Sequence, residues 1–216
     1  MALTRLGGNQ SINLATNTTG TLGVANGGTG LASGTSGQFL KFTGTTTVAS
    51  SAVDAGIGVA EVWGITDTWT SNNAIDPILS SNWAKFAAGG EISAGITASS
   101  GVFTFPSTGI WLIQFHLEMN ASSGSQDRGM RGFIQTTTNN SSYADTVETN
   151  FQSSWTSNSN AAYNNGDTQL IFDVTSTSTH KVRFAMGTQQ GNSNTVRSGS
   201  GTSLRTSVVF LRLGDT

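Results

Sequence analysis

Large apolar residues occupy every second position between residues 111 and 119, and this alternation constrains the fold more than any other feature of the chain. The alternating residues are Trp111, Ile113, Phe115, Leu117 and Met119, with Gln114, His116 and Glu118 between them. A period of two residues places the apolar side chains on one face of a β-strand, whereas a helix repeats every 3.6 residues. The segment is therefore predicted to be a strand with one buried face.

A turn signal precedes this strand. Residues 106–109 contain Pro106 and Gly109 and separate the strand-like run 101–105 from the run 110–120. Proline fixes one backbone dihedral and glycine accepts positive φ values, so both residues favour a tight turn. The two runs are therefore predicted to be neighbouring strands of an antiparallel sheet.

The composition points to the same class of structure. Only 10% of the residues are charged, against about 25% in ordinary soluble domains, and much of the remainder is Gly, Ser, Thr and Asn. Threonine and serine suit solvent-facing strand positions, and glycine and asparagine suit turns, so an all-β fold is expected. The formal net charge of -2 gives no basic surface for a nucleic acid, and nucleic-acid binding is not expected.

Cysteine and long apolar segments are absent from the chain. Without cysteine there is neither a disulfide framework nor a thiolate metal site, so burial between subunits is the expected source of extra stability. No window approaches the roughly 18 consecutive apolar residues of a transmembrane helix, and the start of the chain lacks the apolar run of a secretory signal. A soluble protein without membrane insertion is expected.

The chain divides into two regions of different composition. Residues 1–58 are rich in Gly, Thr, Ser and Ala, contain no Trp and include only two Phe. Such a segment buries too little apolar area to offset roughly 1–2 kcal/mol of backbone entropy per residue, so it is either disordered or ordered by something else. Short alternations at 38–42 and 46–49 suggest hairpins that pack with copies from other chains, or a peptide laid along a partner.

Residues 59–216 show the pattern of a β-sandwich or jelly roll. Short strand-like runs alternate with joints rich in Gly, Asn and Ser, and no helical pattern is present. The predicted strands are residues 59–70, 84–86, 91–94, 101–105, 110–120, 128–137, 146–151, 168–174, 181–187 and 202–213.

The last of these strands is apolar on both faces. Its consecutive apolar residues Val208, Val209, Phe210 and Leu211 are typical of a strand covered on both sides. Either one face lies on the sandwich core and the other on a neighbouring subunit, or the strand is central and lies under a loop. The four residues are candidates for a subunit interface.

The C-terminal region resembles the trimeric jelly-roll heads of the complement globular-head and tumour necrosis factor group. The resemblance spans about residues 60–216 and rests on Gly101, Phe103, Phe105, Pro106, Gly109 and Trp111, followed by the alternating strand. The closing segment 201–211 is similar to the last strand of that group, and Trp111 stands where an aromatic residue, often Tyr, is usual. This resemblance implies a homotrimer.

The N-terminal region resembles a segment common in bacteriophage tail-fibre and virion proteins. The resemblance lies in residues 14–22, 24–30 and 34–40, and Gly23 stands where such segments often carry Pro. It implies a virion appendage whose N-terminal segment attaches to the particle. The candidates for the attachment are the apolar residues Leu3, Leu6, Ile12, Leu14 and Leu22.

The sequence shows no motif that indicates catalysis or metal binding. The Gly27–Gly30 run lacks a following Gly-Lys-Ser/Thr, so it is interpreted as a turn and not as a phosphate loop. His116 and His180 have no spacing that suggests a triad or a metal site. Asp145 and Glu148 are the closest acidic pair outside the termini, but three positions on a strand place them on opposite faces. No catalytic residue, cofactor or metal is predicted.

Exposed aromatic residues are the candidates for ligand binding. Trp155 and Tyr163 lie in the Asn- and Ser-rich stretch 153–165, which is interpreted as a long loop, and loops on a rigid sandwich often carry recognition. Stacking on a sugar is one interpretation, and packing within the protein is the other, since large aromatic side chains usually find cover.

Together these features predict a non-enzymatic phage structural protein, assembled in the bacterial cytoplasm and located in the virion. Residues 1–58 would attach to other virion proteins or form a stalk, and residues 59–216 would form a homotrimeric knob that contacts a host-surface glycan or receptor. A capsid decoration or head-fibre protein and a carbohydrate-binding module are the alternatives. A depolymerase is the enzymatic alternative, and nothing in the sequence calls for it.

Overall fold

The computed structural model covers residues 1–216 and divides the chain into two compact units, residues 1–55 and residues 56–216. Each unit is described by itself. The described residues are 34–45, 47–51, 56–79, 83–86, 90–93, 95–121, 129–152, 162–189, 194–196 and 203–216.

The first unit contains one antiparallel hairpin. Its strands are β1 (Phe39–Phe42) and β2 (Val48–Ser51), and Phe42 pairs with Val48. The alternations at 38–42 and 46–49 predicted a hairpin at this place. Its large apolar side chains, those of Phe39, Leu40 and Phe42, are all exposed.

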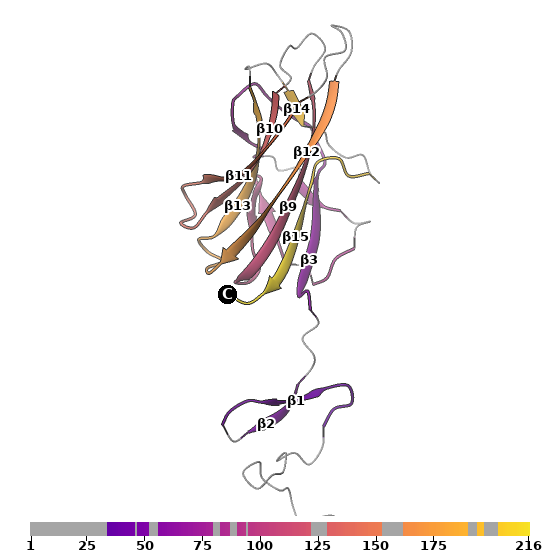
Figure 1. The fold of residues 1–216 in the computed structure, drawn as a ribbon, viewed down its shortest axis with the longest axis vertical. Helices are drawn as coiled ribbons and strands as arrows, with labels where there is room; N and C mark the ends of the chain where they lie inside the picture. The colour runs from indigo at the N-terminus through magenta and orange to yellow at the C-terminus, as the bar shows by residue number, and fades with distance from the viewer. Residues whose placement is uncertain are drawn as a thin grey trace, which may run out of the picture. The chain divides into compact units, whose positions relative to one another are not determined.

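The second unit contains two antiparallel sheets (Figure 1). The first sheet has the order β4-β14-β9-β15-β3-β6, and β12 pairs along the other edge of β9. Strand β9 is therefore the centre of this sheet, since β12 follows its whole length while β15 and β14 share its other edge. The bounds are β3 (Val59–Ile65), β4 (Trp69–Ser71), β6 (Trp83–Lys85), β9 (Gly109–Ala121), β12 (Ala162–Val174), β14 (Asn194–Val196) and β15 (Ser207–Gly214).

The second sheet has the order β11-β10-β13-β8-β7, with β5 also paired to β13. Its strands are β5 (Asp76–Pro77), β7 (Thr97–Ser99), β8 (Val102–Thr104), β10 (Gly129–Thr137), β11 (Ala144–Gln152) and β13 (Lys181–Thr188). The chain crosses repeatedly between the two sheets, from β9 to the hairpin of β10 and β11, back to β12, and then to β13 and β15. Such crossing between two antiparallel sheets is the connectivity of a jelly roll. The predicted all-β class is confirmed.

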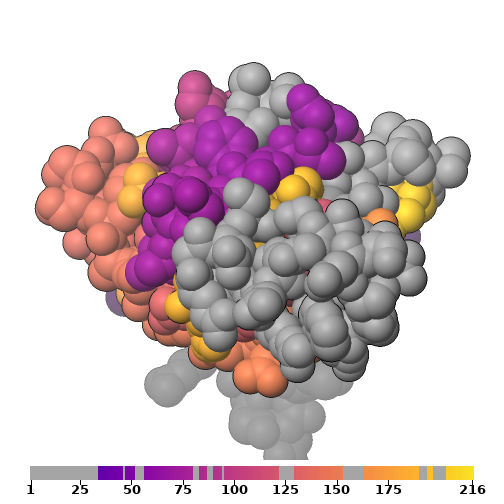
Figure 2. Space-filling view, turned by 90° about the horizontal axis from the view of Figure 1, so that it is seen from above, coloured from indigo at the N-terminus to yellow at the C-terminus, as the bar shows by residue number. Residues whose placement is uncertain are grey.

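The connection between β4 and β5 joins the two sheets at one end of the sandwich. Strand β4 pairs with β14 in the first sheet, and β5 pairs with β13 in the second. The backbone N–H of Thr188 donates to the carbonyl of Asn73 between them, at 3.0 Å. Figure 2 looks onto the molecule from above, and the violet surface of this part of the chain lies there against the yellow surface of later strands.

Aromatic side chains from both sheets fill the core. Phe103 of β8 has four ring neighbours at centroid distances of 5.3–5.5 Å: Trp63, Trp83, Phe184 and Phe210. These edge-to-face and tilted contacts add about 0.5–1.5 kcal/mol each beyond the burial of area. The alternating residues of β9, from Trp111 to Met119, are fully buried in the same core, as the period of two predicted.

The residues that carry the resemblance to jelly-roll heads are structural. Phe103, Phe105 and Trp111 are buried. Gly101 has φ of 77°, and a Cβ at this position would lie 2.2 Å from a backbone carbonyl oxygen. Gly109 has φ of 141°, and its Cβ would lie 2.5 Å from the carbonyl oxygen of Gly214. Both positions therefore require glycine.

A buried carboxylate fixes the segment before β7. Glu61 of β3 is 1% exposed. Its Oε1 accepts hydrogen bonds from the backbone N–H groups of Gly95 and Ile96, the latter at 2.9 Å. Its Oε2 accepts from the indole N–H of Trp63 at 3.0 Å and lies 3.0 Å from the Lys85 ammonium. The charge is thus buried with a full set of donors, as buried charges require.

Several predicted strand limits are wrong. The run 59–70 is interrupted by a bend at 66–68, and residues 91–93 form only an isolated bridge from Ile92 to Ala60. Strand β15 begins at Ser207 and not at residue 202. The predicted joint 187–201 contains the strand β14.

Candidate functional site

The outward-facing side of the first sheet carries an apolar row across four strands. Ile171 of β12 pairs with Leu112 of β9, Leu112 pairs with Leu211 of β15, and Leu211 pairs with Ala60 of β3. Cross-strand partners share a face of the sheet, and their neighbours along each strand point to the core. We call these four residues the apolar row. Ile171 is 64% exposed and the other three residues are half-buried, so the row is partly open to solvent in one chain.

The subunit-interface candidates of the last strand divide between the two faces. Val208 and Phe210 are fully buried and belong to the core of the single chain. Their prediction as interface residues is wrong, because their register with Phe115 and Ile113 turns them inward. Val209 and Leu211 lie on the outer face and are partly exposed.

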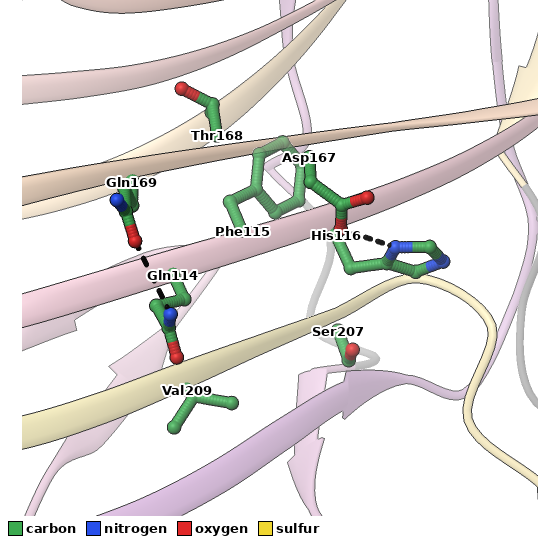
Figure 3. Close-up of a pocket in the computed structure, with 8 residues that line it drawn as sticks. All are labelled: Gln114, Phe115, His116, Asp167, Thr168, Gln169, Ser207 and Val209. Atoms are coloured by element: carbon green, nitrogen blue, oxygen red, sulfur yellow. Dashed lines mark hydrogen bonds and ion pairs between the residues drawn. The ribbon is translucent and has the colours of Figure 1, made fainter.

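A groove of about 540 Å³ lies on the same outer face, next to the apolar row. It is centred on the next two pairs along β9 and β12, Gln114 with Gln169 and His116 with Asp167. Figure 3 shows the side chains that line it. The lining residues are Gln114, Phe115, His116, Asp167, Thr168, Gln169, Ser207 and Val209.

Two hydrogen bonds across β9 and β12 order the polar side chains of the groove (Figure 3). The Gln114 Nε2 donates to Gln169 Oε1 at 3.3 Å, and Nδ1 of His116 lies 2.7 Å from Asp167 Oδ1. Gln114 Oε1 and Gln169 Nε2 remain outside these two bonds, as do one Asp167 oxygen and the second ring nitrogen of His116. The groove therefore presents both donors and acceptors to solvent.

Nucleophilic catalysis does not follow from the His116–Asp167 pair. Ser207 pairs with His116 in the sheet register, so a serine, a histidine and an aspartate lie on three adjacent strands. Among the hydrogen bonds of the described residues, none joins the Ser207 hydroxyl to the imidazole, whereas a serine nucleophile needs that contact with its base.

Asp145 and Glu148, the closest acidic pair of the sequence analysis, each contact a different residue of β10. The Asp145 Oδ1 accepts from the Gln135 side chain at 2.5 Å, and the Glu148 Oε1 lies 2.6 Å from Arg131 Nε. The hydrogen bond from the Arg131 guanidinium lowers the pKa of Glu148 below its usual value. Each carboxylate is thus occupied by its own partner on β10.

The second histidine has a structural position. His180 is buried, stacks on Phe172 with a centroid distance of 5.7 Å, and meets the hydroxyls of Thr175 and Thr179 at 3.2 and 3.1 Å. In the described ranges no group of three or more His, Asp and Glu side chains is arranged to hold a metal ion.

The predicted ligand-binding residues are only partly described. Trp155 lies outside the described residues, and so do the attachment candidates Leu3, Leu6, Ile12, Leu14 and Leu22. Tyr163 does not lie in a loop as predicted, because β12 begins at residue 162 and Tyr163 pairs with Asn120 of β9. It lies on the same outer face as Asp167 and Gln169 and is 56% exposed.

The sequence predicted two of the four polar side chains that are paired across the groove. Gln114 and His116 are on the polar face of the alternating strand, and that face was predicted. Their partners Asp167 and Gln169 were missed because nothing local shows which strand pairs with β9. The polar alternation Asn165, Asp167, Gln169 is the signal that could have indicated a matching strand.

No helix among the described residues is long and apolar enough to span a membrane.

Comparison with known proteins finds similarity only at the level of three-dimensional structure. No family model matches the sequence, and no curated protein is similar to it. Murine APRIL, in a crystal structure at pH 8.5, is similar with 13% identity over 72% of this chain and 98% of its own, with a TM-score of 0.40. The TNF protein Eiger from S. frugiperda is similar with 12% identity over 73% of this chain and 93% of its own, with a TM-score of 0.47.

Proposed function

We propose that the chain is a non-enzymatic structural protein of a bacteriophage virion. It forms a homotrimeric fibre or appendage, its N-terminal segment attaches to other virion proteins, and its jelly-roll unit is exposed for contact with the host surface. The resemblance of residues 14–40 to segments of phage virion proteins supports the location.

The apolar row is the observation that carries the proposed self-association. Its four residues form a continuous apolar stripe across four strands. The next outer positions are the polar Gln114 and Gln169 on β9 and β12, and Val209 and Val62 continue the apolar surface on β15 and β3. An apolar stripe that a single chain leaves partly open to solvent is a common mark of a protein–protein interface. A closed ring of copies would cover the row on each chain, and closure prevents further growth.

The exposed hairpin of the first unit supports the same conclusion. The exposed side chains of Phe39, Leu40 and Phe42 lie in a sheet of only two strands. An isolated hairpin of this size has only marginal stability in water without further packing. Packing of the copies' hairpins against one another would bury these side chains.

Light scattering coupled to size exclusion tests the self-association. We expect the unmodified chain to elute as a trimer and the Leu112→Asp variant to elute as a single chain, because a carboxylate in the row cannot be buried unpaired. Gln152→Asp, at an exposed position of β11 in the other sheet, is the matched control and should remain trimeric. Identical masses for all three proteins would contradict an interface at the row.

Immunogold labelling of intact particles tests the location in the virion. We expect label on the particle, at the tail for a fibre and over the capsid for a head-fibre or decoration protein. Particles without label, from a host that makes the protein, would contradict the virion role.

A carbohydrate-binding module is the second candidate function. The polar groove beside the apolar row favours it, because it presents ordered donors and acceptors on a rigid sheet.

A further inference from the structure

We propose that the groove between β9 and β12 binds a neutral oligosaccharide, with Gln114, His116, Asp167 and Gln169 as the recognising side chains. The inference rests on the second candidate function, a carbohydrate-binding module, and names its ligand class; it does not depend on the proposed virion role.

The hydrogen-bonding groups of the groove match those of sugar hydroxyls. A hydroxyl donates one hydrogen bond and accepts others, so it fits best where a donor and an acceptor lie side by side. The Gln114–Gln169 pair offers the Gln114 Oε1 as acceptor and the Gln169 Nε2 as donor. The His116–Asp167 pair offers a ring nitrogen and a carboxylate oxygen. The Gln114–Gln169 pair thus provides the mixed contact that a hydroxyl needs. In the other pair Nδ1 of His116 donates to Asp167, so the second nitrogen of the neutral ring and the second carboxylate oxygen both accept from a hydroxyl.

The side chains of the groove are held in place before a ligand arrives. They stand on β9 and on β12, which pairs with β9 along its whole length, and the 2.7 Å contact between His116 and Asp167 orders both groups. Pre-ordered polar side chains lose less conformational entropy when they bind than mobile loop residues do. The adjoining Val209 supplies a small apolar contact for the C–H groups of a sugar ring.

The charge of the groove selects a neutral ligand. None of its eight lining residues is Lys or Arg, and the side chain of Asp167 is 73% exposed. Arg205, which lies further along the face, is paired with Glu118 at 2.7 Å. Among the described residues that line the groove, an anionic sugar would therefore meet a carboxylate and no Lys or Arg.

The face extends beyond the groove towards an exposed aromatic residue. Along β12 the outward positions continue from Asp167 through Asn165 to Tyr163. Gln169 lies six positions after Tyr163, and a strand rises about 3.3 Å per residue, so this strip is about 20 Å long. A strip of this length suits a ligand of several sugar units, with Tyr163 as a stacking platform at its end.

A glycan array probed with the full chain, followed by titration of the best ligand, tests the inference. We expect binding to one or more neutral oligosaccharides. Gln169→Ala and Asp167→Asn should each weaken it about tenfold, as expected for the loss of one hydrogen bond to a polar or charged group. Gln152→Ala, the same residue type exposed on the other sheet, should bind unchanged, and melting curves should show that all variants are folded.

Three results would overturn the inference. They are an array with no neutral ligand, an array with anionic ligands only, and a neutral ligand whose affinity is the same for the groove variants and the unmodified chain. Titration of Leu112→Asp separates this inference from the proposed self-association. If the Leu112→Asp variant is a single chain that still binds the sugar, the inference about the groove holds although self-association is lost. If the unmodified chain is a trimer that binds no sugar, the proposed self-association holds and the inference about the groove fails.

Discussion

Removal of the buried carboxylate of Glu61 should destabilise the C-terminal unit strongly. In Glu61→Ala the backbone N–H groups of Gly95 and Ile96 and the indole N–H of Trp63 all lose their acceptor. An unsatisfied buried donor costs about 1–3 kcal/mol, and the loss of one partner from a buried charged cluster costs about 3–5 kcal/mol. We expect the free energy of unfolding to fall by about 4 kcal/mol, measured by urea denaturation followed by tryptophan fluorescence.

The other carboxylate that contacts Lys85 provides the control. Glu91 lies 3.2 Å from the same ammonium, but its side chain is 48% exposed. Exposed ion pairs contribute about 0–1 kcal/mol, so Glu91→Ala should change the stability by less than about 1 kcal/mol. An equally small change in the free energy of unfolding for Glu61→Ala and Glu91→Ala would show that Glu61 does not fix residues 95–96.

Three further predictions follow from burial, backbone geometry and charge. Gly101→Ala should lower the free energy of unfolding by about 2 kcal/mol or more in urea titrations. The reason is that residue 101 has a positive φ and that the new Cβ would lie 2.2 Å from the Ile78 carbonyl oxygen. An unchanged urea midpoint would contradict this. Val208→Asp should leave little folded protein by circular dichroism, whereas Val209→Asp, on the outer face, should still fold; equal effects would contradict the assigned faces. Because the pKa of Glu148 is lowered in the folded state, its contact with Arg131 stabilises the fold above the ordinary pKa and is lost as the pH falls through the lowered value. Glu148→Gln should therefore cost up to about 1 kcal/mol at pH 7 and almost nothing at pH 2; an equal difference at both values would contradict it.

The parts of the fold that the sequence predicted are those where burial is one-sided. Strand β9 alternates because one face meets the core, and its observed limits lie within a residue or two of the predicted ones. The start of β12 was missed because Asn164, Asn165 and Gly166 have the composition of a turn. They form a strand because β9 pairs along the whole of β12, and Gly166 leaves room for the ring of Phe151, 2.3 Å from where a Cβ would lie.

The faces of the last strand show a second limit. Four consecutive apolar residues contain no alternation, so the sequence gives no sidedness, and only the pairing of β15 with β9 turns Val208 inward and Val209 outward. The groove could not be predicted from the sequence for the same reason. Gln169 and Asp167 meet Gln114 and His116 through a register that depends on the tertiary fold.

The mass of residues 1–216 in solution, measured by sedimentation equilibrium at micromolar concentration, shows whether other copies cover the apolar row. We expect a species with three times the 22.4 kDa mass of one chain. A mass of one chain across the whole concentration range would contradict it.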